Sequence, residues 1–497
     1  LMKSSIGILI TLLQIWLSVK ALSVPNSNTK TSTPSNQKSK PAWTPKIQSL
    51  EERRQLRGST HNSELIGTKR FHHIEFYCGD AKSTAFRFSL ALGMPITCFS
   101  GQSTGNDRSC SYGLESGDVR FIFTAPYSQR IHQINNDQDK SKKDDSANNV
   151  VYDAPDPIPS FGVEEAHAFF QKHGIGAKAI ALEVDNASKS FTSAISNGAK
   201  PVLEPTTIEP CAGLLKENPN ASTCEIAEVE LYGDVVLRFV SFDNVEDGEI
   251  SLNESSSILP NFAIHPTKNH KTYGIRRIDH AVGNVPNLLE TIQKITSFSG
   301  FHEFAEFTSE DVGTIDSGLN SVVLASDSED VLLPLNEPTE GRRKSQIQTF
   351  LEQNEGPGLQ HLALKTDDIF HTISKMRLAA EELGGFELMK RPSDEYYAEL
   401  PSRLGDQLSP EQYEKVEELG ILADADDEGI LLQVFTKPIG DRPTFFIEII
   451  QRIGCMLSFD DNDTNDFTQR PGCGGFGQGN FKELFKSIEE HEKTLKV

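Results

Sequence analysis

The sequence of 497 residues has few cysteines and little positive charge. Its seven cysteines are odd in number, and no two of them form a CxxC pair. We therefore do not expect a disulfide scaffold or a thiolate zinc site. Only 48 Lys and Arg stand against 71 Asp and Glu, which gives a formal net charge of −23. Because phosphate contacts need clustered Lys and Arg, this balance argues against a partner nucleic acid.

The first 50 residues lack both a membrane-spanning run and acidic residues. The apolar run Ile6 to Leu17 is too short to span a bilayer comfortably, and small residues follow it, which predicts a signal peptide over residues 1–23. Residues 24–66 are rich in Ser, Thr, Lys and Pro, with no Asp or Glu before Glu51, as in a transit peptide. The pair resembles the two-part leader of proteins sent to complex plastids. We expect a plastid location without a stable membrane span; the alternatives are secretion, or the cytoplasm if the leader is not used.

The remaining chain contains an internal duplication. A chain of this length predicts two domains of roughly 150 to 200 residues plus tails. The same succession of a strand, a helix and further strands occurs over residues 67–245 and again over 275–497, with a polar connection over 246–274. The period is too long for a solenoid and indicates two similar domains. A polar, charged run from Asn135 to Asn149 reads as a surface insertion in the first domain.

The two copies differ in chemistry at aligned positions. The segments RFHHIEF, KAIALEVD and VVLRFVS align with RIDHAVG, QHLALKTD and FFIEIIQ. The alignment places His280, His361 and Glu448 of the second copy over His73, Ala179 and Arg238 of the first. Alanine offers no donor atom and arginine adds a positive charge. Only the second domain is therefore expected to bind a metal cation.

The second copy presents two histidines and a glutamate in three apolar, strand-like segments. An ionised Glu448 is costly there unless it is paired or binds a metal. Two imidazoles and one carboxylate on one face of an octahedral metal leave three positions open, as in non-haem Fe(II) oxygenases. A single strand histidine such as His280 or His361 is more often a core residue, and Glu448 could instead pair with Arg442 or Arg452. In the first copy, two of the three aligned positions carry residues that cannot bind a metal, and this difference favours a metal site in the second copy.

Longer motifs carry a family resemblance. RRIDHAVGNV, KSQIQTFLEQNEGPGLQHLAL, GILLQVFTKPIGDRPTFFIEIIQRIGC and GCGGFGQGNFKELFKSIEEHE closely resemble the 4-hydroxyphenylpyruvate dioxygenases of plants and algae. The resemblance covers about Lys69 to Lys493. It implies an α+β fold of tandem vicinal-oxygen-chelate (βαβββ) modules that form two open β-barrels, with a C-terminal lid helix over residues 480–495. It also implies one Fe(II) per chain, bound by His280, His361 and Glu448.

The reaction is likewise what the resemblance implies. The substrate 4-hydroxyphenylpyruvate brings its own 2-oxo acid, so the enzyme needs O₂ but no 2-oxoglutarate. CO₂ leaves, the ring is hydroxylated, and the side chain migrates to give homogentisate, used in tyrosine catabolism and in plastoquinone and tocopherol precursor synthesis. Family members are dimers or tetramers, so we expect a homodimer. The alternatives are 4-hydroxymandelate synthase, which needs the same ligands, and a non-catalytic metabolite-binding module of the same fold.

The resemblance also implies the residues of the pocket. The polar groups that orient substrate or product are Ser321, Asn336, Gln346, Gln360 and Gln433. Amides suit this task because they donate and accept hydrogen bonds without carrying charge. The groups expected to surround the substrate ring are Phe435, Phe446, Phe476, Asn480, Phe481 and Leu484, with core packing as the alternative for each Phe.

Two local features of this pocket need structure to resolve them. Gln360 neighbours His361 on one strand, so strand alternation puts its side chain on the opposite face unless a twist or bulge intervenes. The terminal helix carries Phe481, Leu484, Phe485 and Ile488 on one face, behind a glycine-rich segment that gives the chain freedom to move. We therefore expect the helix to act as a lid.

Overall fold

The computed structural model describes residues 63–128, 154–216, 221–242, 257–266, 272–308, 318–341, 343–458 and 467–495. The expected signal peptide, the transit-like segment up to residue 62 and the insertion from Asn135 to Asn149 lie outside these ranges. Within them, no helix combines the length and apolar character needed to cross a bilayer.

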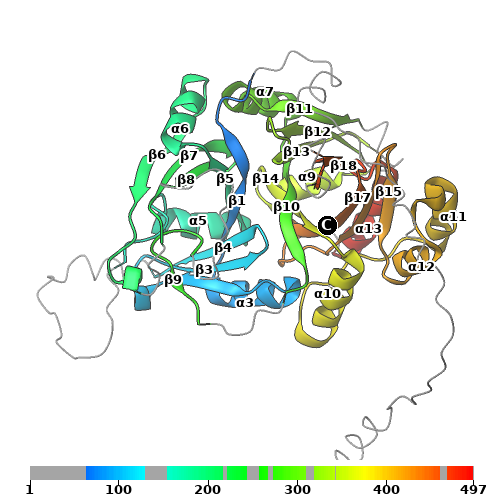
Figure 1. Ribbon diagram of the computed structural model, residues 1–497, viewed down its shortest axis with the longest axis horizontal. Helices are drawn as coiled ribbons and strands as arrows, with labels where there is room; N and C mark the ends of the chain where they lie inside the picture. The colour runs from blue at the N-terminus through cyan, green and yellow to red at the C-terminus, as the bar shows by residue number, and fades with distance from the viewer. Residues whose placement is uncertain are drawn as a thin grey trace, which may run out of the picture. The chain divides into compact units, whose positions relative to one another are not determined.

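The first module joins two βαβββ units in one mixed sheet (Figure 1). Its elements are β1 (Thr68–Tyr77), α3 (Ala81–Leu92), β2 (Ile96–Ser100), η1 (Gln102–Thr104), β3 (Ser109–Ser116), β4 (Val119–Pro126), α5 (Val163–His173), β5 (Gly176–Val184), α6 (Ala187–Ser196), β6 (Pro201–Ile208), η2 (Leu214–Lys216), β7 (Cys224–Tyr232) and β8 (Val235–Phe242). The strand order is β6-β7-β8-β5-β1-β4-β3-β2-β9. The last strand, β9 (Ala263–Ile264), comes from the connection between the modules and pairs with β2.

The second module repeats this arrangement. Its elements are β10 (Ile275–Asn284), α7 (Leu288–Ser299), β11 (His302–Phe307), β12 (Leu319–Ala325), β13 (Leu332–Pro338), α9 (Gln346–Gln353), β14 (Gly358–Thr366), α10 (Ile369–Leu383), α11 (Asp394–Leu404), η3 (Gly405–Gln407), α12 (Pro410–Glu418), β15 (Leu422–Ala425), β16 (Gly429–Phe435), β17 (Phe446–Gly454), β18 (Met456–Ser458), β19 (Phe467–Gln469), η4 (Gln478–Asn480) and α13 (Phe481–Leu495). The order β11-β12-β13-β10-β14-β17-β16-β15 matches that of the first sheet without β9. The expected α+β fold of tandem βαβββ modules is confirmed.

Helices that follow the central strands begin in the same way in both modules. An Asp or Asn at each N-cap accepts a hydrogen bond from a backbone N–H of the first turn, which compensates for one unpaired donor of the helix. These caps are Asp80, Asn186, Asn287 and Asp368. Gly93 and Gly300 end α3 and α7 in the left-handed conformation, with φ of 62° and 74°. Equivalent residues therefore set the helix limits in the two copies.

The strand registers place the aligned residues at equivalent positions. β1 pairs His73 with Ala181 and Glu75 with Ala179, β10 pairs His280 with Ala363 and Val282 with His361, and Arg238 and Glu448 stand beside Ala181 and Ala363 respectively. The two sheets thus present the same three positions with different chemistry.

In the first module a guanidinium takes the place of the possible metal ligands. Arg238 is 1% exposed and donates hydrogen bonds to Glu75 at 2.7 Å, to Glu228 at 2.6 Å and to His73 Nε2 at 2.9 Å. A buried charge is tolerated when it is paired and hydrogen-bonded in this way. The same strands therefore hold an ion-pair network in one module and a possible cation site in the other.

Two of the cysteines are bonded to each other. Cys455 and Cys473 form a disulfide with a Cα–Cα distance of 5.8 Å, within the normal range. The chain returns after β17 and brings the glycine-rich segment beside the end of that strand. The bridge is a single crosslink, not a scaffold, and cysteine spacing did not predict it.

Candidate metal centre

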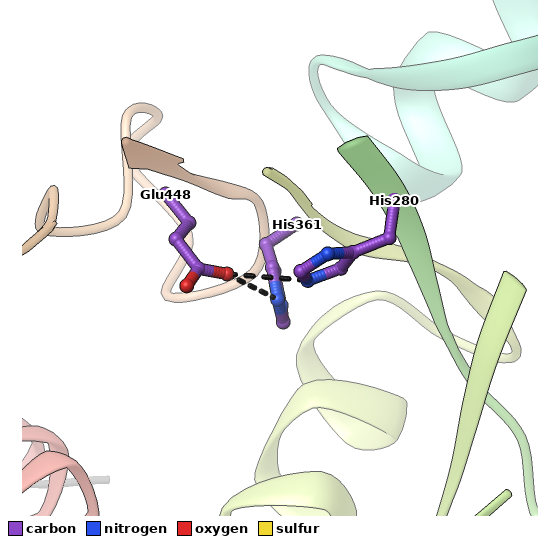
Figure 2. Close-up of side chains that lie close together, drawn as sticks. All are labelled: His280, His361 and Glu448. Atoms are coloured by element: carbon purple, nitrogen blue, oxygen red, sulfur yellow. Dashed lines mark ion pairs between the residues drawn. The ribbon is translucent and has the colours of Figure 1, made fainter. Parts of the chain in front are cut away.

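Three neighbouring strands bring the two histidines and the glutamate together. His280 lies on β10, His361 on β14 and Glu448 on β17, which are adjacent in the sheet. Their possible ligand atoms all lie within 4.8 Å of one another. Glu448 Oε2 is 3.3 Å from His280 Nε2 and 3.4 Å from His361 Nε2 (Figure 2). Two nitrogens and one carboxylate oxygen therefore converge on one point.

The pKa shifts of these three side chains favour binding of a metal cation. Burial raises the pKa of Glu448, but hydrogen bonds with His280 and His361 outweigh burial and lower this pKa to about 2. Burial lowers the pKa of His361. Burial also lowers the pKa of His280, but Asp279 and Glu448 reverse that effect and raise it. An ionised carboxylate beside imidazoles is a donor set that binds a divalent metal with release of any imidazole proton.

The far nitrogen of each imidazole has an oxygen acceptor. His280 Nδ1 lies 2.9 Å from Asp279 Oδ1, and His361 Nδ1 lies 3.0 Å from Gln360 Oε1. Because both acceptors are oxygens, each Nδ1 carries the hydrogen and donates. Each Nε2 then faces Glu448 and can bind a metal once any proton that it shares with this carboxylate has left. This is the arrangement that orients histidines bound to metals in proteins.

A β-bulge explains how Gln360 reaches the same side as His361. β10 pairs Val282 with His361 and the next residue, Gly283, with Leu359. Gln360 has no partner in this register, so the strand bulges there and strict alternation of side chains is interrupted. Its amide therefore lies beside His361 in the cavity wall.

A cavity opens above the three residues. Its unfilled space, which includes open solvent at the mouth, is about 610 Å³. Predicted residues in its wall, besides His280, His361 and Glu448, are Ser321, Asn336, Gln346, Gln360, Gln433, Phe435, Phe446, Phe476, Phe481 and Leu484. Its lining is mostly apolar, with a few amides and one hydroxyl group.

Asn480 is the predicted pocket residue that the structure places elsewhere. It lies in η4, is fully buried, and its Oδ1 accepts a hydrogen bond from the Tyr396 hydroxyl at 2.7 Å. It is not part of the cavity wall. The 3₁₀ turn before α13 directs this amide toward α11, so its role in the structure is to attach the start of α13.

Further apolar residues complete the wall. The sequence does not predict a pocket role for these residues: Val282, Phe307, Leu319, Val323, Pro334, Phe485 and Ile488. Phe485 and Ile488 did stand on the predicted apolar face of the terminal helix. The others belong to strands whose alternation does not distinguish a cavity wall from a solid core.

Comparisons with known proteins identify the family. No family model matches the chain. The chain is 51% identical over 437 residues to 4-hydroxyphenylpyruvate dioxygenase of Plectranthus scutellarioides, covering 87% of this chain and 91% of the relative. Identity to the Arabidopsis thaliana enzyme is 50% over 438 residues, covering 88% and 90%. Identity to the Aspergillus fumigatus enzyme is 32% over 446 residues, covering 87% and 94%.

Solved structures support the fold. A mutant of 4-hydroxymandelate synthase from Streptomyces coelicolor matches with a TM-score of 0.62 at 21% identity, covering 86% of this chain and 99% of that one. A xylose isomerase-like TIM barrel/4-hydroxyphenylpyruvate dioxygenase fusion protein matches with a TM-score of 0.56 at 19% identity, covering 87% and 54%. Taken with the sequence identities to the plant enzymes over nearly the whole relative, these findings show that the chain belongs to the 4-hydroxyphenylpyruvate dioxygenase family.

Proposed function

We propose that this protein converts 4-hydroxyphenylpyruvate and O₂ to homogentisate and CO₂, with Fe(II) held by His280, His361 and Glu448. The observation that carries the proposal is the buried group of two imidazoles and one ionised carboxylate at the base of an apolar cavity. This donor set is that of non-haem Fe(II) oxygenases. A bound Fe(II) supplies redox chemistry with O₂ and open positions for a chelating 2-oxo acid.

The protein's own residues hold the substrate and exclude water. The amides of Gln346, Gln360 and Gln433 reach the cavity, where they can donate to and accept from polar groups of the substrate. Phe446 stacks on the His361 imidazole, with ring centroids 4.7 Å apart and an interplanar angle of 15°, and so forms one wall for an aromatic ring. Because the substrate carries its own 2-oxo acid, we propose that no 2-oxoglutarate is used.

We propose that α13 is a lid. Phe481, Leu484, Phe485 and Ile488 of this helix form part of the cavity wall. Phe485 also packs with Leu319 of β12 and Ile347 of α9, in a cluster separate from the main core. Leu484 and Ile488 of the same helix pack against the main core, so α13 closes one side of the cavity in the manner of an active-site lid.

The reaction itself is tested by oxygen uptake and product analysis. With Fe(II) and ascorbate, the purified protein is expected to consume O₂ on addition of 4-hydroxyphenylpyruvate and to release homogentisate, identified by chromatography. Adding 2-oxoglutarate should not raise the rate. Hydroxymandelate as the main product would show that the protein is a 4-hydroxymandelate synthase, and a lack of uptake would point to a non-catalytic binding module.

The leader supports a proposal on location. The apolar run, followed by residues 24–50 without Asp or Glu, favours import into a plastid, where homogentisate serves plastoquinone and tocopherol precursor synthesis. In another compartment homogentisate serves tyrosine catabolism. A fluorescent protein fused behind residues 1–66 is expected to collect in plastids of the source cell, whereas the same reporter behind residues 24–66 should not. Secretion of the longer fusion would contradict the proposal.

From the family we also propose that the protein is a homodimer. Light scattering measures its mass in solution.

A further inference from the structure

A buried ion pair lies directly behind His280. Asp279, which accepts the Nδ1 hydrogen of His280, is 1% exposed, and the Arg452 side chain is 0% exposed. Arg452 donates through Nε to Asp279 Oδ2 at 2.9 Å and through Nη2 to Asp279 Oδ1 at 2.8 Å. Two hydrogen bonds between a guanidinium and both oxygens of a carboxylate fix the relative orientation of these two planar groups. The ion pair therefore holds Asp279, and through it the imidazole plane of His280, in a defined position.

The same guanidinium also holds the segment that precedes the lid. Arg452 Nη1 donates to the backbone oxygens of Cys473 and Gly475, each at 2.6 Å. Its Cζ lies 5.6 Å from the ring centroid of Phe476, a cavity residue whose ring centroid is 5.6 Å from that of His280. One buried side chain thus contacts both the partner of a metal ligand and the base of α13.

The glycine segment, residues 472–479, fits closely against the pocket. Gly474 and Gly477 have φ of +75° and +73°, in the region that favours glycine. A Cβ at Gly474 would lie 2.5 Å from the carbonyl carbon of Ile430, and one at Gly477 would lie 2.5 Å from Nε2 of Gln433, a pocket amide. A shift of the segment therefore changes the surroundings of the pocket.

The first module provides an internal comparison. Strand register places His72 where the second module has Asp279, and Phe242 where it has Arg452. His72 and Phe242 contact each other as rings, with centroids 5.4 Å apart. The duplicated sheet therefore forms without this ion pair. The pair belongs to the module that carries the metal ligands and the lid.

We propose that Arg452 is a positioning residue that couples the metal centre to the lid. It orients His280 through Asp279 and holds the base of α13 through the backbone of residues 473 and 475. The inference rests on the proposed metal site and extends it: metal binding and ordering of α13 strengthen each other. Because such coupling is reciprocal, the metal affinity and the stability of the lid change by the same factor.

The coupling is measured with Co(II) as the probe metal, through its absorption bands and through amide hydrogen exchange of residues 472–495. In the wild type, Co(II) is expected to slow exchange in this region. Arg452→Gln should weaken Co(II) binding by up to about 10 to 100-fold, the usual effect of losing the partner of a metal-bound histidine, because it leaves Asp279, the partner of His280, without its ion pair. At saturating Co(II), exchange in α13 of the variant should remain as fast as without metal.

Two further variants separate coupling from loss of stability. Arg470→Gln removes a partly buried ion pair with Glu428 near the same segment, and should keep wild-type Co(II) affinity and protection. Asp279→Asn with Arg452→Gln replaces the pair by two neutral amides, so it avoids an unpaired buried charge if the single variant fails to fold. Wild-type affinity and metal-dependent protection in this folded double variant would overturn the coupling. If instead the wild type does not bind Co(II), the proposed metal site itself is wrong.

Discussion

Replacement of His361 by alanine is expected to abolish turnover and to weaken metal binding by more than about 100-fold. Loss of an outer partner of a metal ligand costs about 10 to 100-fold in affinity, and loss of the ligand itself must exceed that. The fold should survive, because the equivalent position in the first module is Ala179, which is fully buried in the sister sheet. Circular dichroism, Fe(II) titration without oxygen, and O₂ uptake measure the three effects.

His371→Ala is the matched control for this substitution. His371 is an exposed residue in the first turn of α10, and its backbone N–H bonds to the Asp368 cap whatever the side chain is. This variant should retain metal affinity and turnover. Undiminished turnover in His361→Ala would remove His361 from the metal centre and leave it as a cavity residue.

A chain that ends at Gly479 is expected to stay folded and to lose turnover by at least about 100-fold. The truncation removes four apolar side chains from the cavity wall, so water reaches the site and the substrate ring loses one wall. The sheet should persist, because its strands supply most of the main core, to which α13 adds only Leu484 and Ile488. Thermal unfolding and product formation measure stability and turnover.

The control for the truncation keeps α13 and changes its solvent side. Lys482 is exposed on this helix and is not part of the cavity wall, so Lys482→Ala should retain wild-type turnover. Full turnover in the truncated chain would show that the helix is docked on the cavity without acting as its lid.

Much of the architecture follows from the sequence, because the duplicated patterns carry local information. Strand alternation, Asp or Asn residues at helix N-caps, and glycines at helix C-termini recur at equivalent residues. The sequence of each module therefore indicates the succession of its strands and helices. Comparison of the copies also marks His280, His361 and Glu448, because Ala179 and Arg238 show that the fold does not need those groups for packing.

Other features arise only from contacts between distant segments. Gln360 reaches the cavity because β14 bulges against β10, and alternation along one strand cannot reveal a change in pairing register. Asn480 turns away from the cavity because the Tyr396 hydroxyl lies beside it, 84 positions away in the chain.

The sequence by itself determined the duplication and the identity of three possible metal ligands, because these depend on patterns repeated within single segments. The fold class came from the resemblance of longer motifs to a known family. Only the tertiary structure decided which buried charged residues pair with one another. The sequence is compatible with an ion pair between Arg452 and Glu448, whereas the folded chain pairs Arg452 with Asp279 and leaves Glu448 facing two imidazoles. Which buried charges form ion pairs depends on the distance and geometry between side chains of different strands. These distances are fixed only when the strands assemble into the sheet.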